Sequence, residues 1–234
     1  MLAALDLSET GNPPPNPALC IRGHRVTQAD TTVDYYHINR RAAWSPYQFL
    51  QARSILDVGG TTNPYFAFFE NYKKTYPVTQ QDGSTVNVSG VRFLGAVANG
   101  EVNSTALPGT AHDLAKHLVA FLRELIWEDV RRKEFPHLPS RQRCIWLIPS
   151  LAGVRYWLKR MEVAADFQVL RLRVQGRIHT ASETHLLGDS ESLNTAIQMA
   201  RQYWLGIVES LETQEIIFEG RVHVLEVVKE AEYA

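Results

Sequence analysis

The clearest periodic pattern in the chain lies between residues 111 and 135. Hydrophobic residues recur there three, four and seven positions apart, as they do on one face of an amphipathic helix. They are Leu114, Leu118, Phe121, Leu122, Leu125, Ile126 and Val130. Thr110 can cap the start of such a helix, and Pro136 can end it. We therefore predict a long helix over residues 111–135 with these apolar residues on its inner face.

Shorter patterns predict the remaining elements. Strands are expected where β-branched and aromatic residues gather, at residues 33–39, 86–89, 91–97, 144–148, 167–174, 215–218 and 222–228. Further helices are expected at 151–161 and 189–209, with a short one beginning near Ser45-Pro46. Gly220 is expected to separate the last two strands.

Changes in composition divide the chain into parts. Residues 1–32 are interpreted as an N-terminal arm, because Asn12–Pro17 is too proline-rich for a helix or a central strand. Residues 57–110 are rich in Gly, Asn, Thr and aromatic side chains and are interpreted as an inserted cap, with a solvent-facing connection as the alternative. Residues 33–234 are predicted to form a single α+β domain that carries this insertion.

Composition narrows the class of protein only slightly. The 24 Lys and Arg nearly balance the 25 Asp and Glu, so the net charge of −1 gives no global attraction to nucleic acid or to an anionic membrane. The two cysteines, Cys20 and Cys144, are far apart and lack zinc-ligand spacing, which favours a reducing cytoplasm. No apolar run is long enough to span a membrane, and we expect no membrane partner.

Three short patterns hold the candidate chemistry. His37 lies in the middle of an apolar strand, Trp146 and Trp157 lie on a strand and on the helix after it, and Glu215 begins a later strand. Each has a structural alternative: a satisfied strand histidine, two core tryptophans, and a charged residue that protects a sheet edge. P-loop, dinucleotide-binding, nucleophile-elbow and HExxH motifs are all missing from the sequence.

In this order the residues resemble the signature of the ADP-ribosyltransferase superfamily, whose split-sheet fold uses a His-Tyr-Glu type triad. His37 matches the strand histidine that donates to the adenosine ribose of NAD, and Asn39 stands where the family often has Thr or Ser. Trp157 follows Trp146 by eleven residues, as the nicotinamide-stacking tyrosine follows its strand, but Trp replaces Tyr. The run that begins at Glu215 matches the strand that begins with the catalytic glutamate.

The resemblance spans roughly residues 33–228 and implies an ADP-ribosyltransferase-like split β-sheet core flanked by helices, with NAD as substrate. Glu215 would stabilise the positive charge that develops on the ribose as nicotinamide leaves, and Glu219 is its rival. Arg141 would bind the diphosphate, with Arg40 or Arg41 as rivals. Trp146 and Ser150 complete the expected cofactor-binding residues.

The implied activity is transfer of ADP-ribose to a macromolecule, which can be protein, RNA or DNA. Among bacterial and phage-type members it is the activity of a toxin or defence effector, whose partner would be an antitoxin or immunity protein. Thr213 stands where arginine-directed members have a second glutamate, so arginine-directed transfer is not implied. The alternative is a non-catalytic interaction module, or a phage structural protein, with the same fold. Convergence of His37, Trp157 and Glu215 on one cleft would favour the enzyme.

Overall fold

The computed structural model describes residues 27–41, 48–79, 82–102, 105, 107–163, 166–186, 191–208, 210 and 213–233. In chain order these form β1 (Thr27–Gln28), β2 (Tyr35–Arg40), β3 (Ile55–Val58), α1 (Pro64–Asn71), β4 (Thr75–Thr79), β5 (Thr85–Ser89), α2 (Gly90–Ala98), α3 (Leu107–Glu134), β6 (Ile145–Leu147), α4 (Leu151–Arg160), β7 (Phe167–Ser182), a 3₁₀ turn (Glu183–His185), α5 (Leu193–Trp204), β8 (Gln214–Val227) and α6 (Glu230–Tyr233). The predicted α+β class is confirmed. Most of the expected N-terminal arm, Cys20 and the start of the helix expected near Ser45-Pro46 lie outside the described residues, and residues 48–53 form no helix.

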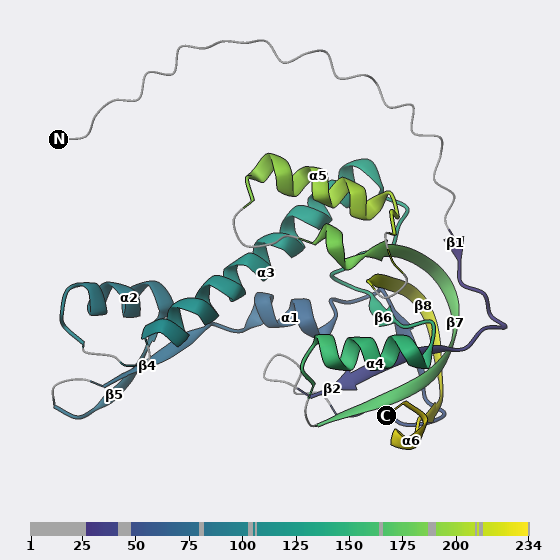
Figure 1. Ribbon diagram of the computed structural model, residues 1–234, viewed down its shortest axis with the longest axis horizontal. Coiled ribbons are helices and arrows are strands. Elements are labelled where there is room, and N and C mark those ends of the chain that lie inside the picture. Colours follow the sequence, from purple (N-terminus) through teal and green to yellow (C-terminus); the bar gives the residue numbers. More distant parts are fainter. Residues whose placement is uncertain are drawn as a thin grey trace, which may run out of the picture.

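The main sheet is built on one long antiparallel pair, β7 and β8. β2 and β1 pair with β7, whereas β6 and β3 pair with β8. β2 and β6 therefore belong to opposite sides of the pair, yet Tyr36 and Ile148 exchange two backbone hydrogen bonds of 2.8 Å just beyond the end of β6. The sheet must curl for this contact to form, and Figure 1 shows β7 as a strongly curved ribbon.

Two facing glycines allow the long pair to approach closely at its bend. Gly176 of β7 is the register partner of Gly220 of β8. A Cβ atom on Gly220 would lie 2.5 Å from the carbonyl oxygen of Gln175, a distance that real Cβ atoms do not show. The prediction that Gly220 separates two strands is therefore wrong, because this glycine permits close pairing within a continuous β8. Glu219 accordingly lies inside the strand rather than in a turn.

The long predicted helix exists, but its inner face differs from the prediction. α3 begins four residues before residue 111, so Thr110 lies in its first turn rather than at its N-cap. Leu118, Leu122 and Leu125 are exposed to solvent. The buried positions of the second half of the helix are instead Glu124, Trp127, Glu128 and Val130. The helix therefore turns two carboxylates and a tryptophan toward the body of the protein.

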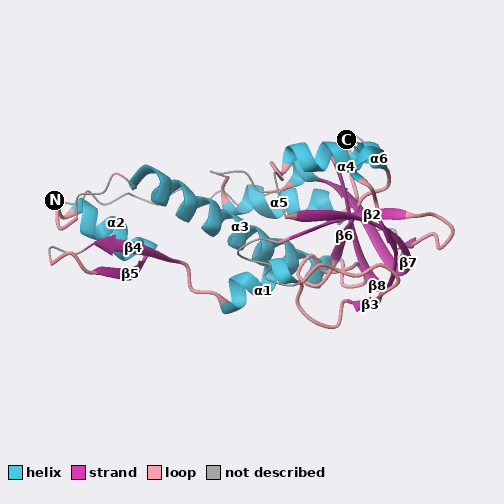
Figure 2. Ribbon diagram, turned by 90° about the horizontal axis from the view of Figure 1, so that it is seen from below, coloured by secondary structure: helices cyan, strands magenta, loops and turns pink. Residues whose placement is uncertain are grey.

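The predicted insertion at residues 57–110 is smaller than expected. β3 pairs with β8 in the main sheet, and α1 follows directly from it. Only β4, β5 and α2 project from the body, packed against the first half of α3 (Figures 1 and 2). The strand predicted at residues 91–97 is wrong, because this segment forms α2. Phe93, Leu94 and Val97 lie on one side of that helix and pack with Tyr76 and Leu114.

Three further hydrophobic clusters hold the body together. One fills the curl of the sheet around Leu170, Leu172 and Phe218. A second joins the sheet to α3 and α5 around Trp127 and Trp204, and a third lies beneath α4 and α6. No helix in the described part of the chain is long and apolar enough to cross a membrane.

We expect Gly220→Ala to destabilise the fold by at least the ~1–3 kcal/mol that is typical of overpacking, because the new methyl group would meet backbone atoms that cannot move aside. Urea denaturation of purified protein measures the free energy of unfolding.

Gly95→Ala is the matched control. Gly95 lies in α2, and no atom lies within 4 Å of the position that its methyl group would take, so alanine should stabilise the helix by up to ~1 kcal/mol. Equal unfolding free energies for the two variants would contradict a close-packed bend at Gly220.

Candidate functional site

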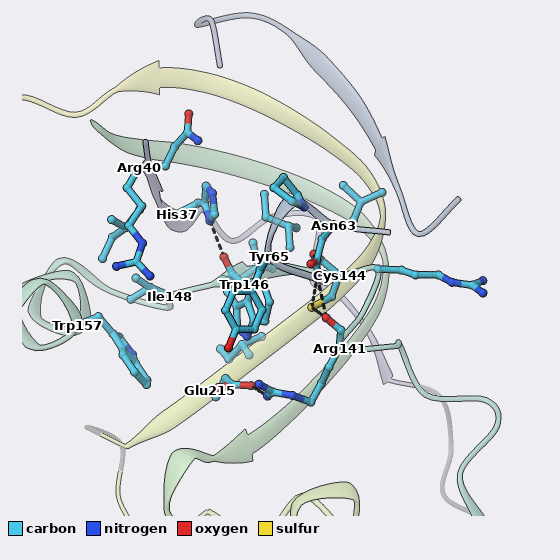
Figure 3. Close-up of a pocket in the computed structure, with 18 of the residues that line it drawn as sticks. His37, Arg40, Asn63, Tyr65, Arg141, Cys144, Trp146, Ile148, Trp157 and Glu215 are labelled. Carbon is cyan, nitrogen blue, oxygen red and sulfur yellow. Dashed lines mark hydrogen bonds and ion pairs between the residues drawn. The ribbon is translucent and has the colours of Figure 1, made fainter. Parts of the chain in front are cut away.

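A cavity of about 650 Å³ opens between β2, β6, α4, the start of β8 and the loop before α1. Its wall includes six of the seven residues singled out in the sequence: His37, Asn39, Arg141, Trp146, Trp157 and Glu215. Figure 3 shows five of these, all but Asn39, labelled around one hollow. The seventh, Ser150, does not line the cavity. Its hydroxyl accepts a hydrogen bond of 3.1 Å from the Gly153 N–H and caps α4.

The curl of the sheet explains why residues so distant in sequence meet. The contact between Tyr36 and Ile148 brings β2 alongside β6, and His37 then lies beside Trp146. Leu147 of β6 is the register partner of Ile216 of β8. Glu215 precedes Ile216 in β8 and therefore lies next to the end of β6. Trp157 reaches the same hollow from α4.

His37 has one ring nitrogen engaged by the protein. Its Nδ1 lies 2.9 Å from the carbonyl oxygen of Trp146. Since a carbonyl only accepts hydrogen bonds, Nδ1 carries the proton in the neutral ring and Nε2 is left as an acceptor. Burial lowers the pKa of His37 from 6.5 to about 4, although the bond to Trp146 opposes that change. The ring is therefore neutral near pH 7 and would accept, not donate, a bond from a ribose hydroxyl.

Glu215 is held through one of its two carboxylate oxygens. Its Oε1 accepts a hydrogen bond of 2.6 Å from the hydroxyl of Tyr203 and a second from Nη1 of Arg141. Burial, reinforced by Glu215, raises the pKa of Tyr203 well above its ordinary value, so this hydroxyl stays a donor. Oε2 has no hydrogen-bond partner among the described residues. One oxygen of a nearly buried carboxylate is thus fixed, and the other remains for a ligand.

Arg141 links Glu215 to a second buried carboxylate. Its Nε and Nη2 lie 3.2 and 3.1 Å from the two oxygens of Glu124 on α3. Burial raises the pKa of Glu124, but the guanidinium groups of Arg141 and Arg123 more than offset that effect and leave the pKa lowered. Arg123 also donates to the hydroxyl of Tyr65 over 3.0 Å. Two carboxylates and two guanidinium groups therefore balance in charge at the cavity wall.

These contacts change the roles expected for three candidates. The Arg141 guanidinium is 3% exposed and is committed to two carboxylates, so it is poorly placed to bind a diphosphate. Asn39 turns its side-chain oxygen to the Leu50 N–H and to Gln168, at 3.0 and 3.1 Å. Glu219 accepts from the Ser140 N–H and from Arg177 outside the main cavity, which favours Glu215 as the reactive carboxylate.

Sequence patterns missed several residues of the site. Four of them lie in segments that were interpreted as ordinary helices or as an insertion: Tyr203, Glu124, Arg123 and Tyr65. Asn63 was missed as well: it caps α1 through Phe66 and donates to the carbonyls of Arg141 and Cys144 at 2.7 and 3.2 Å. One signal in the sequence could have indicated them: the spacing of Glu124, Trp127 and Glu128 places two carboxylates and a tryptophan on one face of the predicted helix. Within the described residues, no group of three His, Cys, Asp or Glu side chains could hold a metal ion.

We expect Arg141→Met to destabilise the protein by ~3–5 kcal/mol, because it would leave two buried carboxylates without their cation. Chemical denaturation measures the loss. Lys133→Met removes an exposed i,i+4 ion pair with Asp129 and should cost only ~0.5 kcal/mol. Similar losses in both variants would contradict a buried network centred on Arg141.

His37 should also make stability depend on pH. Its pKa is lower in the folded protein than the unfolded value of 6.5, so the unfolded chain binds more protons below that pH. Its contribution to stability is complete above pH 6.5 and is lost as the pH falls toward 4. We expect His37→Gln to flatten the unfolding free energy across this window, as measured by urea denaturation at several pH values. An unchanged slope would contradict a neutral, buried His37.

Comparison with known proteins gives a family but no activity. No curated protein matches the chain. A family model described as "Protein of unknown function (DUF2441)" matches residues 35–230. The match begins at the first residue of β2 and ends at the first residue of α6, so it contains the projecting elements and every residue of the cavity wall. The chain belongs to the DUF2441 family.

Proposed function

We propose that this protein is an NAD-dependent ADP-ribosyltransferase with a split-sheet fold of that superfamily. The observation that carries the proposal is the meeting of His37, Trp157 and Glu215, from three distant segments, around one cavity. Its volume of about 650 Å³ lies within the range of pockets that bind cofactors. A surface for a protein partner would not require a buried carboxylate with one oxygen held and the other left open.

The proposed position of NAD follows from the chemistry of the walls. Trp157 offers an aromatic plane on which nicotinamide can stack. Oε2 of Glu215 would accept a hydrogen bond from a hydroxyl of the ribose that carries nicotinamide. Nε2 of His37 would accept one from the adenosine ribose. In Figure 3 Trp157 and Glu215 lie toward one end of the hollow and His37 toward the other.

The diphosphate needs a different cation from the one first expected. Arg40 and Arg143 both line the cavity. In Figure 3 the side chain of Arg40 lies beside His37 and extends in the direction of Trp157. A guanidinium group can bind two phosphate oxygens at once. We therefore assign the diphosphate to Arg40, which was already a rival of Arg141, with Arg143 in support.

Cleavage would proceed by loss of nicotinamide from the ribose. As the bond between ribose C1 and the nicotinamide nitrogen breaks, positive charge spreads over the ribose carbon and ring oxygen. A carboxylate fixed beside that carbon stabilises the charge without having to reorganise. The bonds from Tyr203 and Arg141 fix Glu215 in this way. ADP-ribose would then pass to a macromolecular acceptor, which can be protein, RNA or DNA.

The test is incubation of purified protein with adenylate-labelled NAD and cell lysate, together with chromatography of released nicotinamide. We expect labelling of a macromolecule, or release of nicotinamide, that Glu215→Gln lowers by ~10²-fold or more, as the loss of one transition-state contact does elsewhere. Circular dichroism should confirm that the variant is folded.

Glu219→Gln decides between the two carboxylates, and Glu226→Gln is a control at a half-exposed position of the same strand, where it pairs with Arg171. Both should retain the reaction if Glu215 is the reactive group. The proposed function is wrong if the wild-type protein neither labels a macromolecule nor releases nicotinamide, or if Glu215→Gln reacts as fast as the wild type.

A further inference from the structure

Three carboxylates line the cavity in the described part of the chain: Asp57, Glu183 and Glu215. Asp57 is 75% exposed and pairs with Arg221. Glu183 is 14% exposed, a degree of burial that a glutamate rarely reaches without a specific environment. It was not among the residues singled out in the sequence, and the reaction proposed above assigns it no task.

Glu183 and Glu215 line the same cavity where the β7–β8 pair ends. Ala181 is the register partner of Glu215, and Ser182 is that of Gln214. The ladder continues one step further, because the Glu183 N–H donates to the Thr213 carbonyl over 2.8 Å. Glu183 is the first residue of the 3₁₀ turn that follows β7, and its side chain lines the same cavity as Glu215.

The Glu183 carboxylate is oriented by α4. The hydroxyl of Tyr156 donates to its Oε1 over 2.6 Å. Arg160, one turn further along the helix, approaches both carboxylate oxygens at 3.4 Å, with its side chain 59% exposed. Tyr156 precedes Trp157, so the helix that offers the nicotinamide-stacking plane also orients Glu183. Among the described residues Oε2 has only this long contact, which leaves room for a further donor.

We propose that Glu183 is the general base of the acceptor half-reaction, an inference that rests on the proposed function. Substitution at a ribose carbon can use two carboxylates, one to stabilise positive charge and one to accept a proton. Glu215, held by cationic and hydroxyl donors, would stabilise the charge on the ribose. Glu183, which also lines the cavity, would remove a proton from the incoming nucleophile.

One bond breaks and one forms in the proposed step. The bond between ribose C1 and the nicotinamide nitrogen breaks, and its electron pair leaves with neutral nicotinamide. A lone pair of an acceptor O–H or N–H forms the new bond to C1. The acceptor proton passes to Oε2 of Glu183 and then to solvent. When water is the acceptor, the products are ADP-ribose, nicotinamide and a proton.

Two nucleophiles separate this role from a role in binding NAD. Water must lose a proton as it attacks, whereas azide is an anion that carries none. We expect Glu183→Gln to slow nicotinamide release in plain buffer by ~10²-fold, within the usual contribution of a general base. Added sodium azide should restore the rate toward that of the wild type and yield ADP-ribosyl azide, detected by mass spectrometry. Glu215→Gln should not be restored by azide.

A second variant covers the case in which glutamine perturbs the fold. Glu183→Ala leaves space for a small carboxylate, and added formate should restore the reaction with water. The dissociation constant for NAD, measured by calorimetry, should stay within about twofold of the wild type in both variants, because the base contacts the acceptor and not NAD.

The outcomes distinguish the two proposals. Wild-type release of nicotinamide, together with unimpaired release by Glu183→Gln, would overturn the assignment of Glu183 alone. Slow release that neither azide nor formate restores, or weakened NAD binding, would likewise overturn its role as a base. A wild-type protein that releases no nicotinamide with either water or azide would overturn the proposed function, and the assignment of Glu183 with it.

Discussion

The buried ion pairs of Arg141 are the interaction on which the rest of the site depends. A guanidinium that is almost removed from water is tolerated only when carboxylates replace its hydration. Glu124 supplies two oxygens from α3, and Glu215 supplies one from the start of β8. The pairing therefore joins the long helix to the central sheet at the cavity wall. It also explains why α3 buries Glu124, whereas the other buried glutamate of this helix, Glu128, is bound by Arg131 and Ser140.

The same constraint explains the geometry of Glu215. A carboxylate exposed to water would rotate among several rotamers and would lose entropy when it meets a substrate. Here Tyr203 from α5 and Arg141 from the loop before β6 hold one oxygen from two sides. The curl of β7 and β8 then brings β2 and β6 together, and both strands line the same cavity as this carboxylate. The facing pair Gly176 and Gly220 lets the two long strands approach at the bend. The contacts that shape the sheet therefore also position the residues of the site.

Local sequence patterns predicted the elements better than their contacts. The spacing of apolar residues located α3, α4 and α5, and β-branched runs located most strands of the main sheet. Residues 91–97 misled because a short apolar run fits a strand as well as a helix, and packing against α3 and β4 decides. Gly220 misled because a glycine that breaks a strand and one that permits close pairing look alike without the opposite Gly176.

The sequence predicted several residues that line the cavity, but it did not predict which side chains those residues contact. His37, Trp157 and Glu215 follow one another in a recognisable succession, and all three line the cavity. The commitment of Arg141 to carboxylates depends on Glu124, which a periodicity argument places on no particular face. Glu183 gives no signal at all in the sequence, since its position follows from the length of β7 and from a single backbone bond to Thr213. Pairing across strands can thus supply a second carboxylate that no motif records. Function in such a cavity has to be inferred from the register of the sheet, and not only from residues adjacent to the expected catalytic glutamate.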